Sequence, residues 1–286
     1  MGSGKLTQKM RILAVHAHPD DEASKGAATV AKYLKLGHEV LIVTCTGGER
    51  GDLLNKNLDE SEFKKDIKEF RKKEMQDSIN VLGAKHEWLG FEDSGWVEKG
   101  PVPKGSFADV PIQEPGDKLI KIVREFKPHV LITYDENGGY PHPDHIRTHE
   151  ISMHAWENSQ RLIYKSELGS PWKIKKLYYH QTFSTKKLAV FAEAFKRLGI
   201  DDPYAQWFDE KVDDSHLITT QIECAEFFDV RDAALKAHAS QVDPKGEWFA
   251  MPRDEEKKIW PFEDYQLAAT RVDTTLPETD LLTGLR

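Results

Sequence analysis

Short unbroken apolar runs, separated by stretches with helical patterning, constrain the fold of this chain more than any other feature. Residues 12–15 read Ile-Leu-Ala-Val without a polar interruption, which is typical of a strand buried on both faces of a sheet. Comparable runs predict further strands at residues 40–46, 86–89, 130–133 and 177–180. Strands that alternate with helices predict an α/β fold, Rossmann-like, with a mostly parallel and doubly wound sheet.

The stretches between these runs carry apolar residues at helical spacing. They predict helices at residues 24–36, 61–82, 117–126 and 146–156. After residue 180 the strand alternation stops, and helical segments and acidic loops follow. We therefore expect residues 1–10 to lie outside the folded unit and residues 11–180 to form a catalytic domain. Residues 181–286 are expected to form a smaller, helical and irregular C-terminal region that covers one side of the site.

Length, charge and cysteine content narrow the class of protein. A chain of 286 residues is long enough for one large α/β domain. The net charge of −8 argues against a nucleic-acid partner, which usually requires a basic face. Two cysteines, Cys45 and Cys224, are too few for a disulfide framework. No apolar run approaches the roughly 18 residues that span a bilayer. We expect a cytoplasmic protein that binds neither nucleic acid nor membrane.

Two segments rich in histidine and aspartate follow predicted strands. Residues 18–22 read His-Pro-Asp-Asp-Glu and come after the run at residues 12–15, and residues 140–145 read Tyr-Pro-His-Pro-Asp-His and come after the run at residues 130–133. Ligands of open parallel sheets bind beyond the carboxyl ends of the strands. Acidic groups buried there need a partner, because unpaired buried carboxylates are costly. A divalent cation would supply the missing charge.

The spacing within the two segments permits a division of roles. His18 and Asp21 are three residues apart and can turn toward one point at a helix start, which leaves Asp20 free to act as a base. His142 and His145 are also three apart, so one imidazole could bind the cation while the other faces substrate. Two histidines and one carboxylate with an open position suit catalytic zinc. Each segment alone could equally be a helix cap or a rigid turn, but the occurrence of both favours a metal site.

Other catalytic patterns are weak or missing. His149 follows one helical turn after His145, where a supporting or surface role is favoured over metal binding. His149, Glu150 and His154 do not form a metalloprotease helix, because the two histidines are five residues apart instead of four. The glycine-rich residues 47–51 match neither a dinucleotide fingerprint nor a P-loop.

The two segments resemble those of the LmbE-like (PIG-L) family of zinc-dependent N-deacetylases, and within it most of all the amidase branch that acts on mycothiol S-conjugates. The similarity covers almost the whole chain after residue 10. It includes the stretches at residues 14–22, 44–51, 134–145, 237–242 and 278–282. The first and third of these stretches are the most specific.

The resemblance assigns roles at the metal site. It implies that His18, Asp21 and His145 bind one zinc ion per chain. Asp20 would be the general base that takes a proton from the attacking water and passes it to the leaving amine. A cationic His142 would stabilise the oxyanion of the tetrahedral intermediate.

The same resemblance extends to neighbouring residues. Asp144 would orient and charge the oxyanion-stabilising imidazole, and Tyr140 would help to polarise the carbonyl. Contacts to the sugar and inositol would fall on Arg71, Asp52 and Asp93, whose charged groups suit sugar hydroxyls.

The implied reaction is hydrolysis of the amide that joins N-acetylcysteine to glucosaminyl-inositol, which releases a mercapturic acid from an S-conjugated toxin. The partner would be this small-molecule thiol conjugate. Lys25 favours the amidase branch, where a lysine would contact the cysteinyl part, although a solvated helix lysine is the alternative. Trp96, Phe107 and Trp172 are candidates for the S-substituent pocket, with simple packing as their alternative. An N-acetylglucosaminyl-inositol deacetylase, a two-metal phosphoesterase and a non-catalytic sugar- or nucleotide-binding module stay open.

Overall fold

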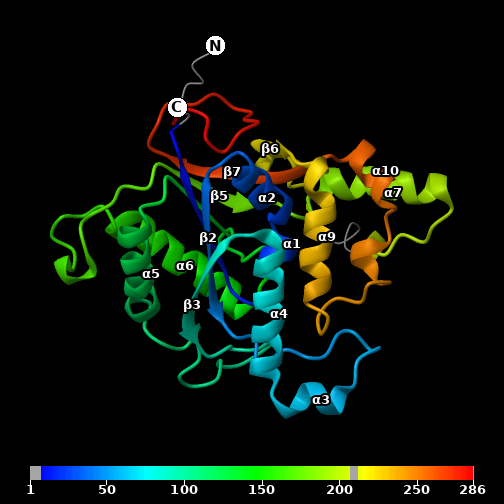
Figure 1. Ribbon diagram of the computed structural model, residues 1–286, viewed down its shortest axis with the longest axis horizontal. Helices are drawn as coiled ribbons and strands as arrows, with labels where there is room; N and C mark the ends of the chain where they lie inside the picture. The colour runs from blue at the N-terminus through cyan, green and yellow to red at the C-terminus, as the bar shows by residue number, and fades with distance from the viewer. Residues whose placement is uncertain (1–7, 207–211, 286) are drawn as a thin grey trace.

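The computed structural model describes residues 8–206 and 212–285, which contain a seven-stranded sheet in the order β3-β2-β1-β4-β5-β7-β6 (Figure 1). The first five strands in this order are parallel, and β7 and β6 are antiparallel to their neighbours. The predicted mostly parallel α/β sheet is therefore confirmed. The strands are β1 (Arg11–His16), β2 (Glu39–Thr46), β3 (Lys85–Phe91), β4 (Val130–Thr133), β5 (Lys176–His180), β6 (Thr220–Glu223) and β7 (Phe262–Thr270).

Helices connect the strands and cover both faces of the sheet. The α-helices of the described residues are α1 (Asp21–Ser24), α2 (Ala27–Lys35), α3 (Glu60–Lys65), α4 (Ile67–Leu82), α5 (Gln113–Phe126), α6 (Pro143–Asn158), α7 (Thr185–Leu198), α9 (Phe228–Ala237) and α10 (Arg253–Ile259). Short 3-10 turns are η1 (Ser166–Leu168), η2 (Ser215–Leu217), η3 (Ala225–Phe227) and η4 (Glu247–Phe249).

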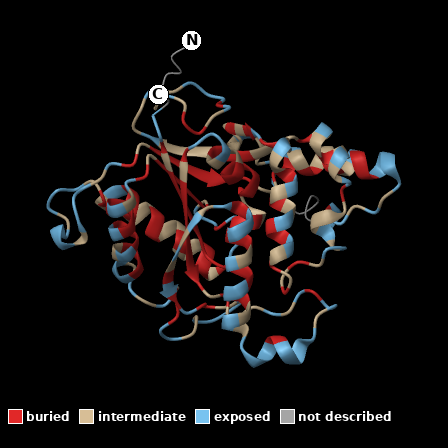
Figure 2. Ribbon diagram, in the orientation of Figure 1, coloured by how far each residue is buried: buried red, intermediate tan, exposed pale blue. Residues whose placement is uncertain are grey.

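Successive residues of the central strands face opposite layers, because side chains alternate along a strand. Ile12 and Ala14 of β1 belong to the core on the side of α2, α4 and α9. Leu13 and Val15 belong to the core on the side of α5 and α6. Figure 2 shows the strands buried between these helices. An apolar run without polar alternation is therefore the correct signature of a strand in this sheet.

The position of β1 and β4 explains why two distant segments meet. The chain runs from β1 to β2 and β3 on one side, and then returns to place β4 on the other side of β1, with Ile12 opposite Val130. In open α/β sheets such a reversal of strand order leaves a crevice at the carboxyl ends of the strands, where ligands bind. The segment after β1 and the segment after β4 both enter that crevice.

Two predicted helices are interrupted. The helix expected at residues 24–36 divides into α1 and α2 at Gly26, whose φ is 96°. A Cβ at this position would lie 2.9 Å from Tyr265 Oη, so both the turn and the packing favour glycine. The helix expected at residues 61–82 breaks at Asp66, where φ is −156° and the side chain caps α4 by accepting from Glu69 N.

The C-terminal region differs from the expectation of a helical and irregular segment. It contributes β7, which pairs with β5 and sets His180 opposite Tyr265, and β6, which pairs with β7. The sheet thus continues past residue 180. The expectation that no strand follows residue 181 is wrong, because the mixed polar and apolar sequence of β7 lacks the continuous apolar run of the central strands.

The predicted N-terminal boundary also needs a correction. Residues 1–7 of the stretch expected to lie outside the folded unit are outside the described residues. Met10, however, is 1% exposed and donates its backbone N–H to His38 Nδ1 at 3.2 Å. The folded unit therefore includes Met10.

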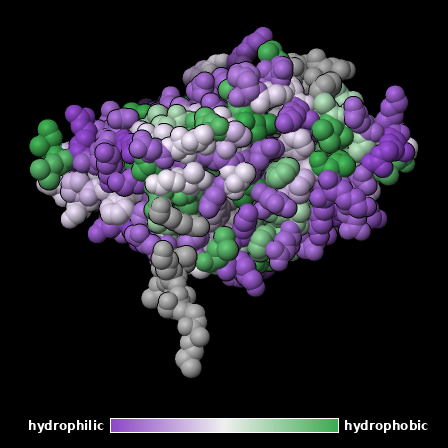
Figure 3. Space-filling model, turned by 90° about the horizontal axis from the view of Figure 1, so that it is seen from above, coloured by the Kyte–Doolittle hydropathy of each residue, from purple (hydrophilic) through white to green (hydrophobic). Residues whose placement is uncertain are grey.

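The surface seen in Figure 3 is mainly hydrophilic, with apolar side chains in scattered patches. The most exposed large apolar residues within the described part include Leu162 and Ile163, in the loop after α6. None of the helices in residues 8–206 and 212–285 has the length and apolar content that crossing a membrane requires.

Candidate metal centre and active site

The three predicted metal ligands lie together in the crevice between β1 and β4. Asp21 Oδ2 lies 3.7 Å from His18 Nδ1 and 3.5 Å from His145 Nε2. All three residues are buried, and one potential ligand atom of each lies within 4.8 Å of the others. The structure thus brings together the set that the sequence predicted.

The far nitrogen of each imidazole has an acceptor that orients the ring. His18 Nε2 lies 3.2 Å from Asp144 Oδ2 and 3.5 Å from Asp93 Oδ1. His145 Nδ1 lies 2.9 Å from the carbonyl oxygen of Gly138. Histidines that bind metals almost always donate their other N–H to a carboxylate or carbonyl in this way. The remaining nitrogen of each ring is therefore directed at the shared carboxylate.

The charges around His18 favour a cation. Burial lowers the pKa of His18, but its hydrogen bonds to Asp144 and Asp93 outweigh this effect and raise it to about 10. Burial likewise opposes ionisation of Asp21, yet Lys25 and the two imidazoles hold its pKa well below the usual value. Lys25 Nζ donates to Asp21 Oδ1 at 2.6 Å. Two imidazoles and a carboxylate in such an anionic setting fit a divalent transition metal.

A second group of potential ligands overlaps the first. His18, Asp93 and His142 also place one potential ligand atom each within 4.8 Å of one another. Asp93 faces His18 Nε2, the nitrogen that Asp144 also approaches. Asp144 Oδ2 is held in turn by Ser94 N at 2.9 Å. A cation in this second group would have to displace the Asp144 hydrogen bond, so we favour the first group.

Asp20, next to the predicted ligand Asp21, lies on a strained backbone. Its φ of 107° is unusual for a residue with a side chain and costs on the order of 1–3 kcal/mol. Its Oδ2 lies 3.3 Å from Arg71 Nη2, and burial raises its pKa above the ordinary value. A raised pKa increases the affinity of this carboxylate for a proton, which is a property that a general base requires.

Arg71, predicted to contact the sugar, lies at this same place and is 3% exposed. Its guanidinium donates to Pro19 O at 2.6 Å and to Gly48 O at 2.8 Å. Gly48 has a φ of 64°, and a Cβ there would meet Arg71 Nη1 at 2.1 Å. The arginine is therefore built into the loops of the site and holds Asp20.

Glu22 and His238 form a buried pair to which the sequence assigned no role. His238 Nε2 lies 2.6 Å from Glu22 Oε1, which also accepts from Ser78 Oγ. The other carboxylate oxygen, Oε2, accepts from Asp20 N at 3.0 Å and so holds the strained turn. Burial opposes ionisation, but His238 and Ser78 lower the pKa of Glu22 to about 2. Both residues fall in stretches that carried the family resemblance, which was the available signal.

The 142–145 segment forms the start of α6, and so begins earlier than the helix predicted at residues 146–156. His142 is the N-cap, and its Nδ1 accepts from Asp144 N at 3.1 Å. Pro143 follows at the first helical position, where its fixed φ suits a helix. His145 is thus held by a regular first turn.

Two expectations for this segment differ from the structure. The Asp144 carboxylate contacts His18 and Ser94 N, whereas its predicted partner was the His142 ring. Burial and the neighbouring His18 lower the pKa of His142 to about 4, which opposes the expected cationic form. Asp144 Oδ1 has no hydrogen-bond partner among the described residues. The interactions of Asp144 therefore favour a role in orienting His18.

Tyr140 and Trp96 lie at the mouth of the crevice. Tyr140 is 45% exposed, and its Oη lies 3.3 Å from His145 Nε2. The Trp96 ring is 6.2 Å from that of Tyr140 and 6.0 Å from that of His142. Tyr140 can therefore reach a group bound at the predicted ligands.

The other two aromatic candidates lie away from the crevice. Phe107 is fully buried and packs against Phe91, with 5.6 Å between the ring centroids. Trp172 donates its Nε1–H to Pro128 O at 2.6 Å, before β4 begins. Simple packing, the alternative for both, agrees with these contacts.

Of the remaining predicted residues, Asp52 is not joined to the buried cluster. It is exposed, and its backbone carbonyl accepts from Gln241 Nε2 at 3.0 Å. Lys25, by contrast, lies inside the site on Asp21, with its Nζ 6.0 Å from the Tyr134 ring centroid. The Nδ1 atom of His149 lies 3.0 Å from Tyr134 O, which agrees with a supporting role.

Comparison with known proteins agrees with this geometry. Residues 13–156 match the family described as PIG-L, GlcNAc-PI de-N-acetylase. The chain is 46% identical over 293 residues to the mycothiol S-conjugate amidase of Streptomyces coelicolor, covering 98% of this chain and 99% of the relative. It is 35% identical over 294 residues to the 1D-myo-inositol 2-acetamido-2-deoxy-alpha-D-glucopyranoside deacetylase of Streptomyces scabiei. This match covers 96% of this chain and 90% of the relative.

A solved structure has the same fold. The N,N'-diacetylchitobiose deacetylase from Pyrococcus horikoshii superposes with a TM-score of 0.62 at 20% identity, covering 91% of this chain and 84% of that one. At this identity the likeness concerns the fold alone. Together with the sequence matches, the converged His-Pro-Asp segments lead to one conclusion. The chain belongs to the PIG-L (LmbE-like) family.

Proposed function

We propose that this protein is a zinc-dependent amidase that hydrolyses the cysteinyl–glucosamine amide of mycothiol S-conjugates. The products are a mercapturic acid and glucosaminyl-inositol. The observation that carries the proposal is the buried set of His18, Asp21 and His145, next to Asp20, whose carboxylate contacts Arg71. Full-length identity of 46% to an amidase with this name, against 35% to the named deacetylase, supports the substrate.

His18, Asp21 and His145 would hold the zinc ion. When bound, zinc polarises a carbonyl and lowers the pKa of water to about 7. Asp20 takes a proton from the water as the water oxygen bonds to the amide carbon. When the carbon–nitrogen bond breaks, Asp20 returns that proton to the glucosamine nitrogen, so that the leaving group departs as a neutral amine.

Donors at the mouth of the crevice stabilise the charge that develops on the carbonyl oxygen. Tyr140 is placed to donate its hydroxyl hydrogen, since its Oη lies near His145 Nε2. His142 adjoins His18, with 4.7 Å between the ring centroids, and can donate from its Nε2 because Nδ1 is occupied as an acceptor. Donors of this kind contribute about 2.7–4 kcal/mol each in other acyl-transfer enzymes.

The alternative is the N-acetylglucosaminyl-inositol deacetylase of mycothiol biosynthesis. The relatives that are about one-third identical over nearly the full chain carry that name, which keeps this alternative open. Both reactions place an amide of the same glucosamine at the same catalytic groups. Lys25, which pairs with the predicted ligand Asp21, would contact the cysteinyl part of the larger substrate and so supports the amidase.

Substrate preference and metal content, measured on one sample, test the proposal. We expect about one zinc per chain and a kcat/KM at least about tenfold higher for a bimane-labelled mycothiol conjugate than for the N-acetylated sugar. A large preference for the acetylated sugar would establish the deacetylase instead. Two metal ions per chain, with phosphate-ester cleavage, would favour the phosphoesterase.

A further inference from the structure

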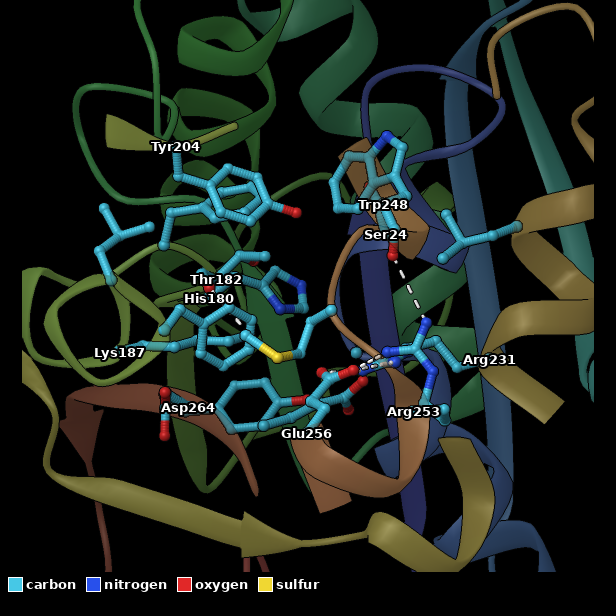
Figure 4. A pocket seen from close by; sticks show the side chains of 18 residues that line it. Ser24, His180, Thr182, Lys187, Tyr204, Arg231, Trp248, Arg253, Glu256 and Asp264 are labelled. Carbon is cyan, nitrogen blue, oxygen red and sulfur yellow. Dashed lines mark hydrogen bonds and ion pairs between the residues drawn. The ribbon is translucent and has the colours of Figure 1, made fainter. Parts of the chain in front are cut away.

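A cavity apart from the metal centre lies beyond the carboxyl end of β5 (Figure 4). It encloses about 60 Å³ and opens to solvent at its mouth. Its walls come from the α1–α2 connection, the segment after β5, the helices α7, α9 and α10, the turn η4 and the strand β7. One wall is aromatic and apolar, formed by Phe183, Phe191, Tyr204, Trp248 and Met251.

The cavity and the metal centre share the wall made by residues 24–26. Ser24 and Gly26 line the cavity, and Lys25 between them donates to Asp21 on the other side. At Gly26 an added Cβ would lie 2.9 Å from Tyr265 Oη and 3.1 Å from His180 Cε1. The backbone of this connection is therefore packed directly on the floor of the cavity.

A row of rings leads from the predicted ligands to the cavity. Tyr134 stacks on His145 with 4.3 Å between centroids, and it lies 6.4 Å from His180. His180 lines the cavity and is 8% exposed. Its Nε2 has no hydrogen-bond partner among the described residues. A buried ring nitrogen without a partner is available to a polar atom of a ligand.

Strand order decides which end of a substrate would face the cavity. The predicted ligands lie at the junction of β1 and β4, in the middle of the sheet. Arg71 and Asp93, the predicted sugar contacts near the ligands, approach from the β2–β3 side, since they contact Gly48 and Arg50. The cavity lies on the opposite, β5–β7 side. A substrate with its sugar toward β3 would direct its acyl end toward the cavity.

We infer that this cavity binds the S-substituent of the conjugate, an aromatic group linked through the cysteinyl thioether. The inference rests on the proposed function and assigns the part of the substrate that the relatives' names leave open. The cysteinyl part would pass Lys25, and the ring would stack against the aromatic wall, where aromatic pairs contribute beyond their buried area.

Among the charged side chains that line the cavity, one amine is available to bind a polar group on the aromatic ring of the substituent. Arg231 is bound by Glu256 at 2.9 and 3.0 Å. Lys187 Nζ forms no ion pair with a carboxylate of the described residues, and it donates to Thr182 O at 3.4 Å. Burial lowers the pKa of Lys187 to about 8. An ammonium in this position suits a carbonyl or carboxylate on the substituent.

Filling the cavity tests the inference. Thr182→Trp places a large side chain in it, and Glu193→Trp puts the same side chain on the exposed face of α7 as a control. The substrates are the S-methyl and S-bimane conjugates of mycothiol. For Thr182→Trp we expect kcat/KM to fall about tenfold or more with the bimane conjugate and to change less than about twofold with the methyl conjugate. The control variant should match wild type on both.

Phe183→Ala provides a second variant, which opens the cavity. We expect it to weaken binding of the product N-acetyl-S-bimane-cysteine, measured by fluorescence, while its zinc content stays at the wild-type level. The inference would be overturned if both cavity variants lowered kcat/KM equally for the two conjugates. The inference would also fail if Trp96→Ala lowered kcat/KM more for the bimane conjugate than for the methyl conjugate while the cavity variants did not. The substituent would then lie beside Trp96, at the mouth of the crevice between β1 and β4. If wild type cleaves neither conjugate, the proposed function fails, and this inference with it.

Discussion

The segments at residues 18–21 and 142–145 share the sequence His-Pro-Asp but fold in different ways. In the first, Asp20 adopts a φ of 107° and the helix that follows, α1, is four residues long. In the second, His142 caps a regular helix of 16 residues. The two segments lie close together because the strands that precede them, β1 and β4, are neighbours in the sheet. One segment is nevertheless a strained turn, and the other is an ordinary helix start.

This difference explains why equivalent positions have different roles. The strained turn brings His18 and Asp21 together and sets the Asp20 carboxylate beside Arg71. In the helix start His145 joins them, whereas His142 uses its Nδ1 to cap the helix. The residue types supply the chemistry, and the local backbone decides which residue performs each part of it.

Loss of a predicted ligand should have the largest effect. Asp21→Ala or His145→Ala should lower metal affinity by more than the about 10–100-fold that loss of an orienting partner costs. Asp144→Asn, which weakens such a partner of His18, is the matched variant and should stay within that range. Zinc titration followed by mass spectrometry measures all three. Equal affinities for the ligand and partner variants would break the assignment.

Asp20→Ala separates the base from the ligands within the first segment. We expect kcat to fall by about 10²–10⁴-fold while zinc content is unchanged, because Asp20 is not among the predicted metal ligands. Steady-state kinetics and metal analysis on the same preparation provide the check. Turnover near the wild-type rate would show that another group moves the proton.

Glu22→Ala tests what holds the strained turn. It leaves His238 buried without its partner, and breaking a buried charged pair costs about 3–5 kcal/mol of unfolding free energy. It also releases Asp20 N, so kcat should fall as well. Ser78→Ala removes one hydrogen bond to the same carboxylate and should cost only about 1 kcal/mol with kcat retained. Urea unfolding measures both variants, and equal losses of unfolding free energy in the two would contradict this account.

Loss of the helix cap in the second segment should have the smallest effect of these changes. His142→Ala loses the acceptor for Asp144 N, whereas asparagine is among the best N-cap residues. His142→Ala should therefore be about 1 kcal/mol less stable than His142→Asn, with activity reduced equally in both. Thermal unfolding measures the difference. A stable Ala variant would mean that α6 does not depend on this cap.

The sequence could predict the central strands and the composition of the site because both depend on local patterns. Unbroken apolar runs identify strands covered on both faces, and they predicted β4 at its observed bounds. Two histidine–aspartate segments after such strands predicted a shared crevice, since parallel strands end at the same edge. The resemblance then supplied the ligand set, which the structure brings together.

What the sequence missed depends on contacts between distant residues. β7 is recognisable only through its antiparallel pairing with β5, because its own residues mix polar and apolar types. Glu22 and His238 are 216 residues apart, and no local spacing joins them. The partner of Asp144 was assigned within its own segment, but its carboxylate reaches across to His18. Asp52, grouped with the sugar contacts, is exposed, and its role stays a prediction.

The central claim is that the two segments hold a single metal ion through His18, Asp21 and His145. Anomalous diffraction at the zinc edge, from crystals of the zinc-loaded protein, tests it most directly. We predict one peak at roughly 2.0–2.2 Å from His18 Nδ1, Asp21 Oδ2 and His145 Nε2, the usual zinc–ligand distance. A peak among His18, Asp93 and His142, or none in the crevice, would contradict the account.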